Sequence, residues 1–224
     1  MSLFPTQMRP LPYHRPLPGR DYWIADDVLA DPLAVRARAL ARSDWEMGYP
    51  YTGEVWPGMR SCPALADDEL QALERTVREL TGAAKLWVEQ AADGARLNHN
   101  CVQVVGSTEG AVKPHTDSSN LCRYAAVLYL NPDAPAKCGT SFFRQRLAGG
   151  ALGGNIVMAP HRNLAEALGN RFVQPDAFAV DVAVPHRFNR LLLYKANLIH
   201  SASAYWGMGD AASKRMTAVF FWMA

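Results

Sequence analysis

The second half of this 224-residue chain is a succession of short, strongly apolar segments, and they limit the possible folds more than any other feature. After residue 96, five segments rich in valine, leucine and aromatic residues follow one another: NHNCVQVV, RYAAVLYLN, TSFFRQ, FNRLLLYKA and RMTAVFFW. These residue types favour β-strands, and each segment has the length of one strand. We therefore expect an all-β second half that forms one antiparallel sandwich or barrel.

The first half carries two helical patterns. Asp31 can cap a helix that begins with Pro32, and apolar residues follow it. From residue 68 to 80, apolar residues recur at spacings of three and four, and Gly82 ends the segment. We expect both helices to support the β half, so that the chain forms one domain.

Three other stretches are irregular. Residues 1–20 contain five prolines, which fix φ and remove amide donors, so we expect an extended arm. Residues 48–61 combine glycine, proline and aromatic residues, which is typical of a substrate-facing segment or of a packed surface loop. Residues 149–187 form an insertion with a short helix at NLAEALG that could act as a lid. The expected organisation is an arm at 1–20 and a single domain at 21–224, divided into helical support and substrate loop at 21–95 and β core at 96–224.

Composition excludes several classes of protein. Apolar residues make up 49% of the chain, charged residues 20%, and the net charge is +2, which is typical of a soluble globular domain. No basic cluster indicates binding to nucleic acid or to a membrane surface, and no apolar run reaches the ~20 residues of a membrane span. The first residues lack the apolar stretch of a signal peptide. We expect a cytoplasmic monomer or homodimer whose partner is a small molecule or a peptide.

The four cysteines, Cys62, Cys101, Cys122 and Cys138, include no CxxC pair. A chain of this length can bury enough surface to fold without disulfides or structural zinc. We therefore expect the cysteines to be small buried apolar residues rather than metal ligands.

One short motif can carry chemistry. His115 and Asp117 stand two residues apart, so on a strand their side chains point to the same face and can reach one metal ion. Such a pair alone is weak evidence, because it often arises by chance. His200, at the end of RLLLYKANLIH, supplies a second histidine. Two histidines and one carboxylate form the facial triad that holds non-heme Fe(II) and leaves positions open for O2 and a cosubstrate.

The last apolar segment begins with a candidate for cosubstrate binding. If the electrons come from a 2-oxo acid, its distal carboxylate needs a buried, bidentate partner, and a guanidinium has that geometry. Arg215 is the candidate. Thr217 lies two residues further on the same strand face and can donate a hydroxyl to the same carboxylate.

These residues resemble the Fe(II)- and 2-oxoglutarate-dependent oxygenase superfamily, and within it the prolyl-4-hydroxylase-like branch. The resemblance covers roughly residues 98–222. Its motifs follow in the family's order: His115-Thr-Asp117, Arg123 leading to Tyr129-Leu130-Asn131, Cys138-Gly139-Thr140, His200, Arg215 and Trp222. The resemblance implies a mainly β (α+β) protein, a double-stranded β-helix of the jelly-roll or cupin-like type with supporting N-terminal helices.

The resemblance also implies an activity. His115, Asp117 and His200 would form the metal and catalytic site for Fe(II), with 2-oxoglutarate and O2 as cosubstrates and Arg215 and Thr217 on the 2-oxoglutarate. The reaction would be hydroxylation of a C–H bond of an amino acid, a peptide or a small metabolite, with release of succinate and CO2. Related halogenating enzymes have a small residue at the position of Asp117, so its presence favours hydroxylation or another oxidation.

The chain departs from the family pattern at two points. The glycine pair is Cys138-Gly139 here, and the tyrosine often found on the strand before His-x-Asp is absent. The cosubstrate pocket therefore has three further candidates: Gln103, Tyr129 and Asn100. Candidate substrate contacts are Arg60 and Arg123 for a carboxylate, with Trp56, Trp206, Tyr49 and Tyr51 as pocket walls.

Two other functions are compatible with a triad alone. One is a β-sandwich binding or sensor module, and the other is a cupin-like metal enzyme that uses no oxo acid. Neither needs a buried guanidinium that faces the metal, so Arg215 with Thr217 distinguishes the oxygenase hypothesis from both.

Overall fold

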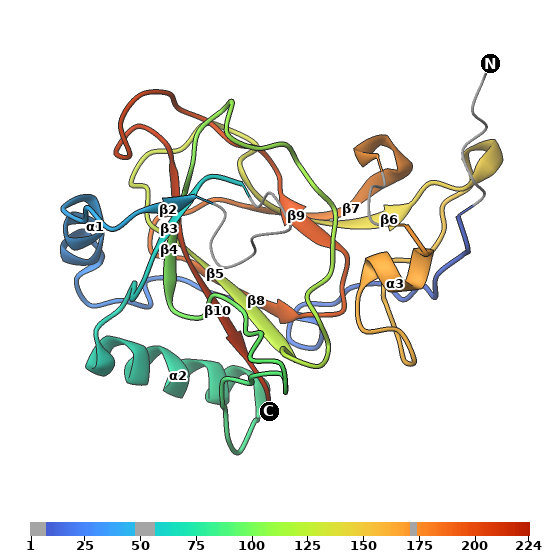
Figure 1. The fold of residues 1–224 in the computed structure, drawn as a ribbon, viewed down its shortest axis with the longest axis horizontal. Helices are drawn as coiled ribbons and strands as arrows, with labels where there is room; N and C mark the ends of the chain where they lie inside the picture. The colour runs from blue at the N-terminus through green and yellow to red at the C-terminus, as the bar shows by residue number, and fades with distance from the viewer. Residues whose placement is uncertain (1–7, 48–56, 171–173) are drawn as a thin grey trace.

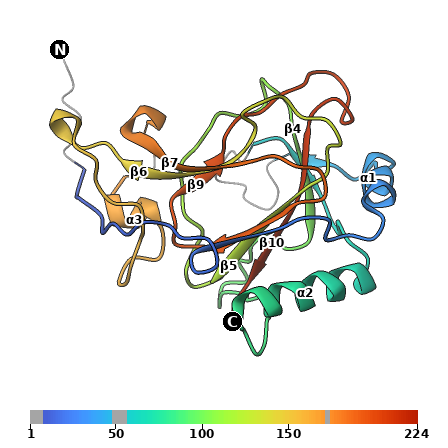
Figure 2. The ribbon, with the colours of Figure 1, turned by 180° about the vertical axis from the view of Figure 1, so that it is seen from behind.

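The structure, a computed structural model, describes residues 8–47, 57–170 and 174–224. Two antiparallel sheets lie face to face, and Figures 1 and 2 show them from opposite sides. The larger sheet has the strand order β1-β8-β5-β10-β4-β3-β2 and the smaller one the order β7-β6-β9. This is the expected double-stranded β-helix. The strands are β1 (Tyr22–Ala25), β2 (Glu46–Met47), β3 (Met59–Ser61), β4 (Cys101–Val105), β5 (Tyr124–Tyr129), β6 (Gly139–Gln145), β7 (Phe178–Pro185), β8 (Leu191–Lys195), β9 (His200–Ala202) and β10 (Arg215–Trp222).

Strand β10 shows how the larger sheet separates two environments. It lies between β5 and β4, and its successive side chains point to opposite faces. Four alternate residues belong to the apolar core between the sheet and the helices: Met216, Ala218, Phe220 and Trp222. The other four line a cavity between the sheets: Arg215, Thr217, Val219 and Phe221. The period of two therefore places the expected cosubstrate residues on the interior face.

Both expected helices are present. Helix α1 (Pro32–Leu40) is capped by Asp31, whose carboxylate accepts a hydrogen bond from the Ala34 amide at 2.9 Å. Helix α2 (Asp67–Thr81) ends at Gly82, which adopts φ 71°. The two helices pack against the outer face of the larger sheet, where α2 runs along its lower edge in Figure 1. In the described part of the chain no helix is long and apolar enough to cross a bilayer.

The proline-rich arm is extended from residue 8 onward and is bound to the smaller sheet's side of the domain. The Gln145 side chain accepts from the Leu11 amide at 2.8 Å and donates to the Arg9 carbonyl at 3.0 Å. The Asn155 side chain donates to the His14 carbonyl at 2.8 Å. Gln145 and Asn155 are almost fully buried, so the arm provides hydrogen-bond partners for two amides that water cannot reach freely.

The expected insertion at 149–187 is partly wrong. It contains the expected short helix, α3 (Leu164–Leu168), capped by Asn163, and the 3-10 turns η1 (Ala148–Gly150) and η2 (Pro175–Ala177). Its last third, however, is strand β7, which pairs along β6 and belongs to the β core. The sequence of β7, FAVDVAVP, has six apolar residues in eight and so carries a strand signal of its own, although only two of the eight residues are buried.

The expectation for the cysteines holds for two of the four. Cys122 and Cys138 are buried thiols. Cys62 and Cys101 instead form a disulfide. Ser61 on β3 pairs with Val102 on β4, so the antiparallel register places Cys62 opposite Cys101. This neighbour relation depends on strand pairing between distant segments, which cysteine spacing alone does not reveal.

Candidate metal centre

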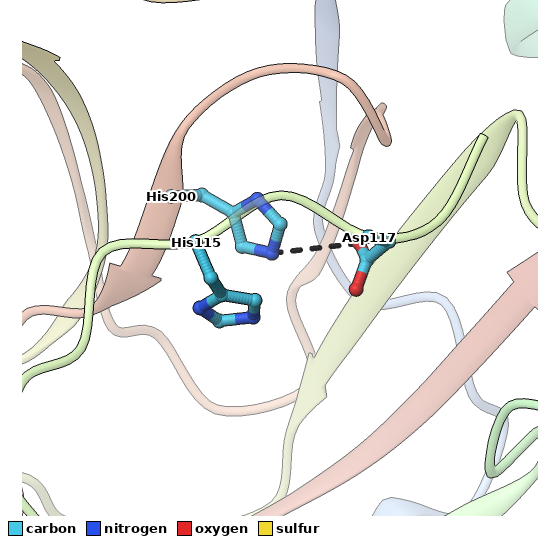
Figure 3. Close-up of side chains that lie close together, drawn as sticks. All are labelled: His115, Asp117 and His200. Atoms are coloured by element: carbon cyan, nitrogen blue, oxygen red, sulfur yellow. Dashed lines mark ion pairs between the residues drawn. The ribbon is translucent and has the colours of Figure 1, made fainter. Parts of the chain in front are cut away.

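The two histidines of the predicted triad meet across a strand bridge. The His115 amide donates to the His200 carbonyl at 3.0 Å, and the His200 amide donates back to the His115 carbonyl at 2.8 Å. This bridge brings the two rings together, with centroids 4.5 Å apart and planes tilted by 52°. Asp117 turns in beside them, with Oδ2 3.5 Å from His200 Nε2 (Figure 3). The three ligand atoms all lie within 4.8 Å of one another, as one metal ion requires.

Hydrogen bonds to the backbone fix how both imidazoles present their nitrogens. His115 Nδ1 lies 2.7 Å from the Lys113 carbonyl, and His200 Nδ1 lies 2.8 Å from the Leu198 carbonyl. A carbonyl only accepts, so Nδ1 must carry the proton in each neutral ring. The lone pair is then on Nε2, which is the arrangement of a histidine that binds a metal.

Burial determines the charges of the triad. It raises the pKa of Asp117 to about 6, and His115 acts in the opposite direction. It lowers the pKa of both His115 and His200 to about 4. At neutral pH the site therefore consists of one carboxylate and two neutral imidazoles. Asp117 Oδ2 is buried without a hydrogen bond, and a buried carboxylate of this kind is costly unless a cation compensates it. The donor set fits a divalent metal such as Fe(II).

The triad opens into a cavity of about 530 Å³ between the sheets, and Arg215 lies in its wall. Arg215 is only 3% exposed, and its Nη1 donates to Thr217 Oγ1 at 3.3 Å. Its Nε has no hydrogen-bond partner, and within the described ranges no carboxylate pairs with its guanidinium. Arg215 and Thr217 thus share the cavity with His115, Asp117 and His200, and a buried cation in this position fits an anionic ligand.

The other candidates for the cosubstrate pocket are placed differently. Gln103 lines the cavity, and its Nε2 donates to the Pro57 carbonyl at 3.0 Å. Tyr129 lies behind the wall, because its hydroxyl donates to Thr140 Oγ1 at 2.9 Å, and Thr140 lines the cavity. Asn100 lies outside it. Its side chain accepts from the Leu65 amide at 2.9 Å and donates to the Leu65 carbonyl at 3.0 Å, so it anchors the chain before α2.

Of the candidate substrate contacts that the structure describes, only Arg60 lines the cavity, where it is 8% exposed. Arg123 is exposed and donates to the Ala224 carbonyl at 3.2 Å. Trp206 stands against His186, with ring centroids 5.7 Å apart, and does not line the cavity. Trp56, Tyr49 and Tyr51 lie outside the described residues.

Two tyrosines that sequence reasoning missed also line the cavity. Tyr194 comes from β8, and its ring centroid is 4.5 Å from that of His200. Tyr205 comes from the loop between β9 and β10, and the Arg215 guanidinium carbon is 5.8 Å from its ring centroid. Tyr194 looks like one more core residue within RLLLYKA, and only the direction of the strand reveals that it faces the metal centre.

Similar folds occur in solved structures of low sequence identity. SnoK, a non-heme alpha ketoglutarate dependent carbocyclase from nogalamycin biosynthesis, has a TM-score of 0.55 and 16% identity, covering 92% of this chain and 80% of SnoK. AviO1 from Streptomyces viridochromogenes Tue57 has a TM-score of 0.53 and 16% identity, covering 92% and 90%. The epimerase SnoN, solved with Fe3+, alpha ketoglutarate and nogalamycin RO, has a TM-score of 0.52 and 19% identity, covering 91% and 79%. These likenesses confirm the fold that the resemblance implies.

Sequence comparison defines the family. No curated protein matches the sequence. Residues 13–222 match DUF6445, which is described as a family of unknown function. The match includes both sheets, both supporting helices, the triad and Arg215. The chain therefore belongs to the DUF6445 family, and this member has the double-stranded β-helix fold with a His-Asp-His centre between its sheets.

Proposed function

We propose that this protein is an Fe(II)- and 2-oxoglutarate-dependent dioxygenase. The observation that carries the proposal is that three metal-ligating side chains and a buried guanidinium line the same cavity. A metal-binding or sensor module, or a metal enzyme without an oxo acid, has no need of Arg215 in that wall. The fold that the chain shares with SnoK and SnoN supports the proposal, since the names of both structures include alpha ketoglutarate.

Each part of the cavity has a role in this proposal. His115, Asp117 and His200 would hold Fe(II), and Arg215 with Thr217 would bind the distal carboxylate of 2-oxoglutarate. Fe(II) held by these residues would supply the oxidative decarboxylation of 2-oxoglutarate by O2 to succinate and CO2, and with it the oxidising power to attack a C–H bond. The apolar wall, which includes Val219 and Phe221, limits water at the centre and so strengthens the electrostatic contacts there.

The reaction that we propose is hydroxylation of a C–H bond in an amino acid, a peptide or a small metabolite. Asp117 supports an oxygen-transferring outcome, because its carboxylate occupies a ligand position that a halogenating enzyme leaves to chloride. Carbocyclase and epimerase are the activities named for SnoK and SnoN, so product analysis must cover ring formation and inversion as well as hydroxylation.

Anaerobic titration tests the proposal. Addition of Fe(II) and 2-oxoglutarate to the purified protein should produce a visible charge-transfer band, and admission of O2 should yield succinate. His115→Ala and Asp117→Ala should lose both signals. Arg215→Gln should raise the concentration of 2-oxoglutarate for half-saturation roughly tenfold or more while Fe(II) still binds.

Arg75→Gln is the matched control, because Arg75 is exposed on α2, away from the cavity. It should behave as the unmodified protein does. Absence of the band in the unmodified protein, or unchanged 2-oxoglutarate binding in Arg215→Gln, would overturn the proposal.

A further inference from the structure

The charged side chains of the cavity wall indicate which chemical class of substrate fits the cavity. Among the described residues that line the cavity, three side chains are cationic and one is acidic: Arg60, Lys113 and Arg215 against Asp117. If the proposed function is right, a divalent metal and the dianion 2-oxoglutarate cancel one another's charge. Arg215 then serves 2-oxoglutarate, and Arg60 is a second buried guanidinium of the same wall that can attract a further anionic group.

Strand register separates Arg60 from the cosubstrate residues. Arg60 on β3 pairs with Gln103 on β4, and Gln103 pairs with Thr217 on β10. Neighbouring strands lie about 4.8 Å apart, so the backbone of Arg60 is roughly 10 Å from that of Thr217. Arg60 therefore stands two strands away from the residues proposed to hold 2-oxoglutarate, on the same inner face of the sheet.

Tyr205 is a tyrosine of the cavity wall whose surroundings include both guanidiniums. The guanidinium carbon of Arg215 is 5.8 Å from its ring centroid. Burial raises the pKa of the Tyr205 phenol, and the charges of Arg215 and Arg60 both act in the opposite direction. The hydroxyl makes no hydrogen bond with any described residue, although it belongs to the cavity wall. It is placed to donate to a ligand that one of the guanidiniums binds.

We propose that Arg60 and the Tyr205 hydroxyl form a second anion subsite, which binds a carboxylate of the primary substrate. The Arg60 guanidinium has five N–H donors in a planar fork, so it can receive a carboxylate in addition to contacts that hold it in the wall. One cation and one hydroxyl suit a single negative charge better than a phosphate, which carries nearly two. The substrate class is therefore a carboxylic acid, and the proposal rests on the proposed function.

Calorimetric titration of matched probes tests the subsite. The protein is first saturated with Ni(II) and 2-oxoglutarate, so that Arg215 is occupied. The probes are acetate and acetamide, benzoate and benzamide, and N-acetylleucine and N-acetylleucinamide, with inorganic phosphate as a separate arm. At least one acid should bind roughly tenfold more tightly than its amide, since charge-assisted hydrogen bonds are worth about that much.

Variants then assign the preference to its residues. Arg60→Gln should abolish the preference for the acid while 2-oxoglutarate binding is unchanged. Tyr205→Phe should weaken acid binding by roughly threefold to tenfold, and Arg75→Gln should leave it unchanged. The subsite is refuted if no acid binds in preference to its amide, if phosphate binds more tightly than every acid, or if Arg60→Gln retains the preference. Failure of 2-oxoglutarate to bind at the first step refutes the proposed function instead.

Discussion

Asp117 is the residue whose protonation controls the metal centre. Burial raises its pKa to about 6, so in the metal-free protein the carboxyl holds a proton below that pH. A metal ion binds the carboxylate, and the proton must leave first. We expect the affinity for Fe(II) or Co(II) to be constant above about pH 7 and to fall roughly tenfold per unit as the pH decreases below 6.

The Co(II) absorption spectrum, titrated from pH 7.5 to 5 under anaerobic conditions, measures this affinity. The two histidines should add to the decrease only near pH 4, because burial lowers their pKa to about that value. An affinity that does not change between pH 7.5 and 5 would contradict the buried, acid-sensitive Asp117.

The same residue should make the metal-free protein less stable. The pKa of Asp117 is higher in the folded protein than its ordinary value, so ionisation of Asp117 lowers the stability of the fold. This loss is complete above about pH 6 and absent below about pH 4. We expect Asp117→Asn to raise the free energy of unfolding of the metal-free protein by ~1–3 kcal/mol at pH 7 and to lose this advantage towards pH 4. Urea denaturation at both pH values measures it, with Asp133→Asn, in an exposed loop, as the control. A destabilising Asp117→Asn at pH 7 would show that other contacts dominate.

At the scale of elements, the periodicity of apolar residues predicted those helices and strands that local sequence determines. Helices α1 and α2 carry their own caps, and the five apolar segments became β4, β5, β6, β8 and β10. Strand β7, FAVDVAVP, carries a strand signal of its own, but the sequence prediction assigns it to the insertion. The Cys62–Cys101 disulfide and the inward direction of Tyr194 depend on which strands pair. The triad was predictable because its motif stands within the order of a known family, whereas Tyr205 lies in a loop with no motif.

The structure gives Asn100 an anchoring role, whereas the sequence suggested a cosubstrate role. A substitution at this position distinguishes the two. It has φ 54°, and its amide makes two hydrogen bonds to Leu65, which belongs to the core under the helices. Asn100→Gly tolerates that φ and removes only the hydrogen bonds. We expect it to lower the free energy of unfolding by about 1–3 kcal/mol and to leave the half-saturating concentration of 2-oxoglutarate unchanged. Urea denaturation and the anaerobic titration measure the two effects, and weaker 2-oxoglutarate binding without loss of stability would restore the cosubstrate role.

At the scale of the whole molecule, the N-terminal arm connects to the metal centre through one short path. The arm bonds Asn155, and the Asn155 carbonyl accepts from the Ile199 amide at 2.9 Å, one residue before His200. The arm also crosses Gly154 so closely that a Cβ there would collide with the carbonyls of Leu11 and Pro12. The arm is therefore a structural part of the domain that supports the strand carrying His200.

Removal of residues 1–16 should consequently weaken the molecule and its centre together. The buried amides of Gln145 and Asn155 lose their partners in the arm, so we expect the free energy of unfolding to fall by about 2–4 kcal/mol, with a lower affinity for Co(II). Gly154→Ala in the full chain should reproduce much of both effects, because the added methyl group displaces the arm. In the truncated chain the same substitution should have little further effect, since the two changes act on one contact. Calorimetry and Co(II) titration of the four proteins measure this cycle, and additive effects would show that Gly154 matters for a reason other than the arm.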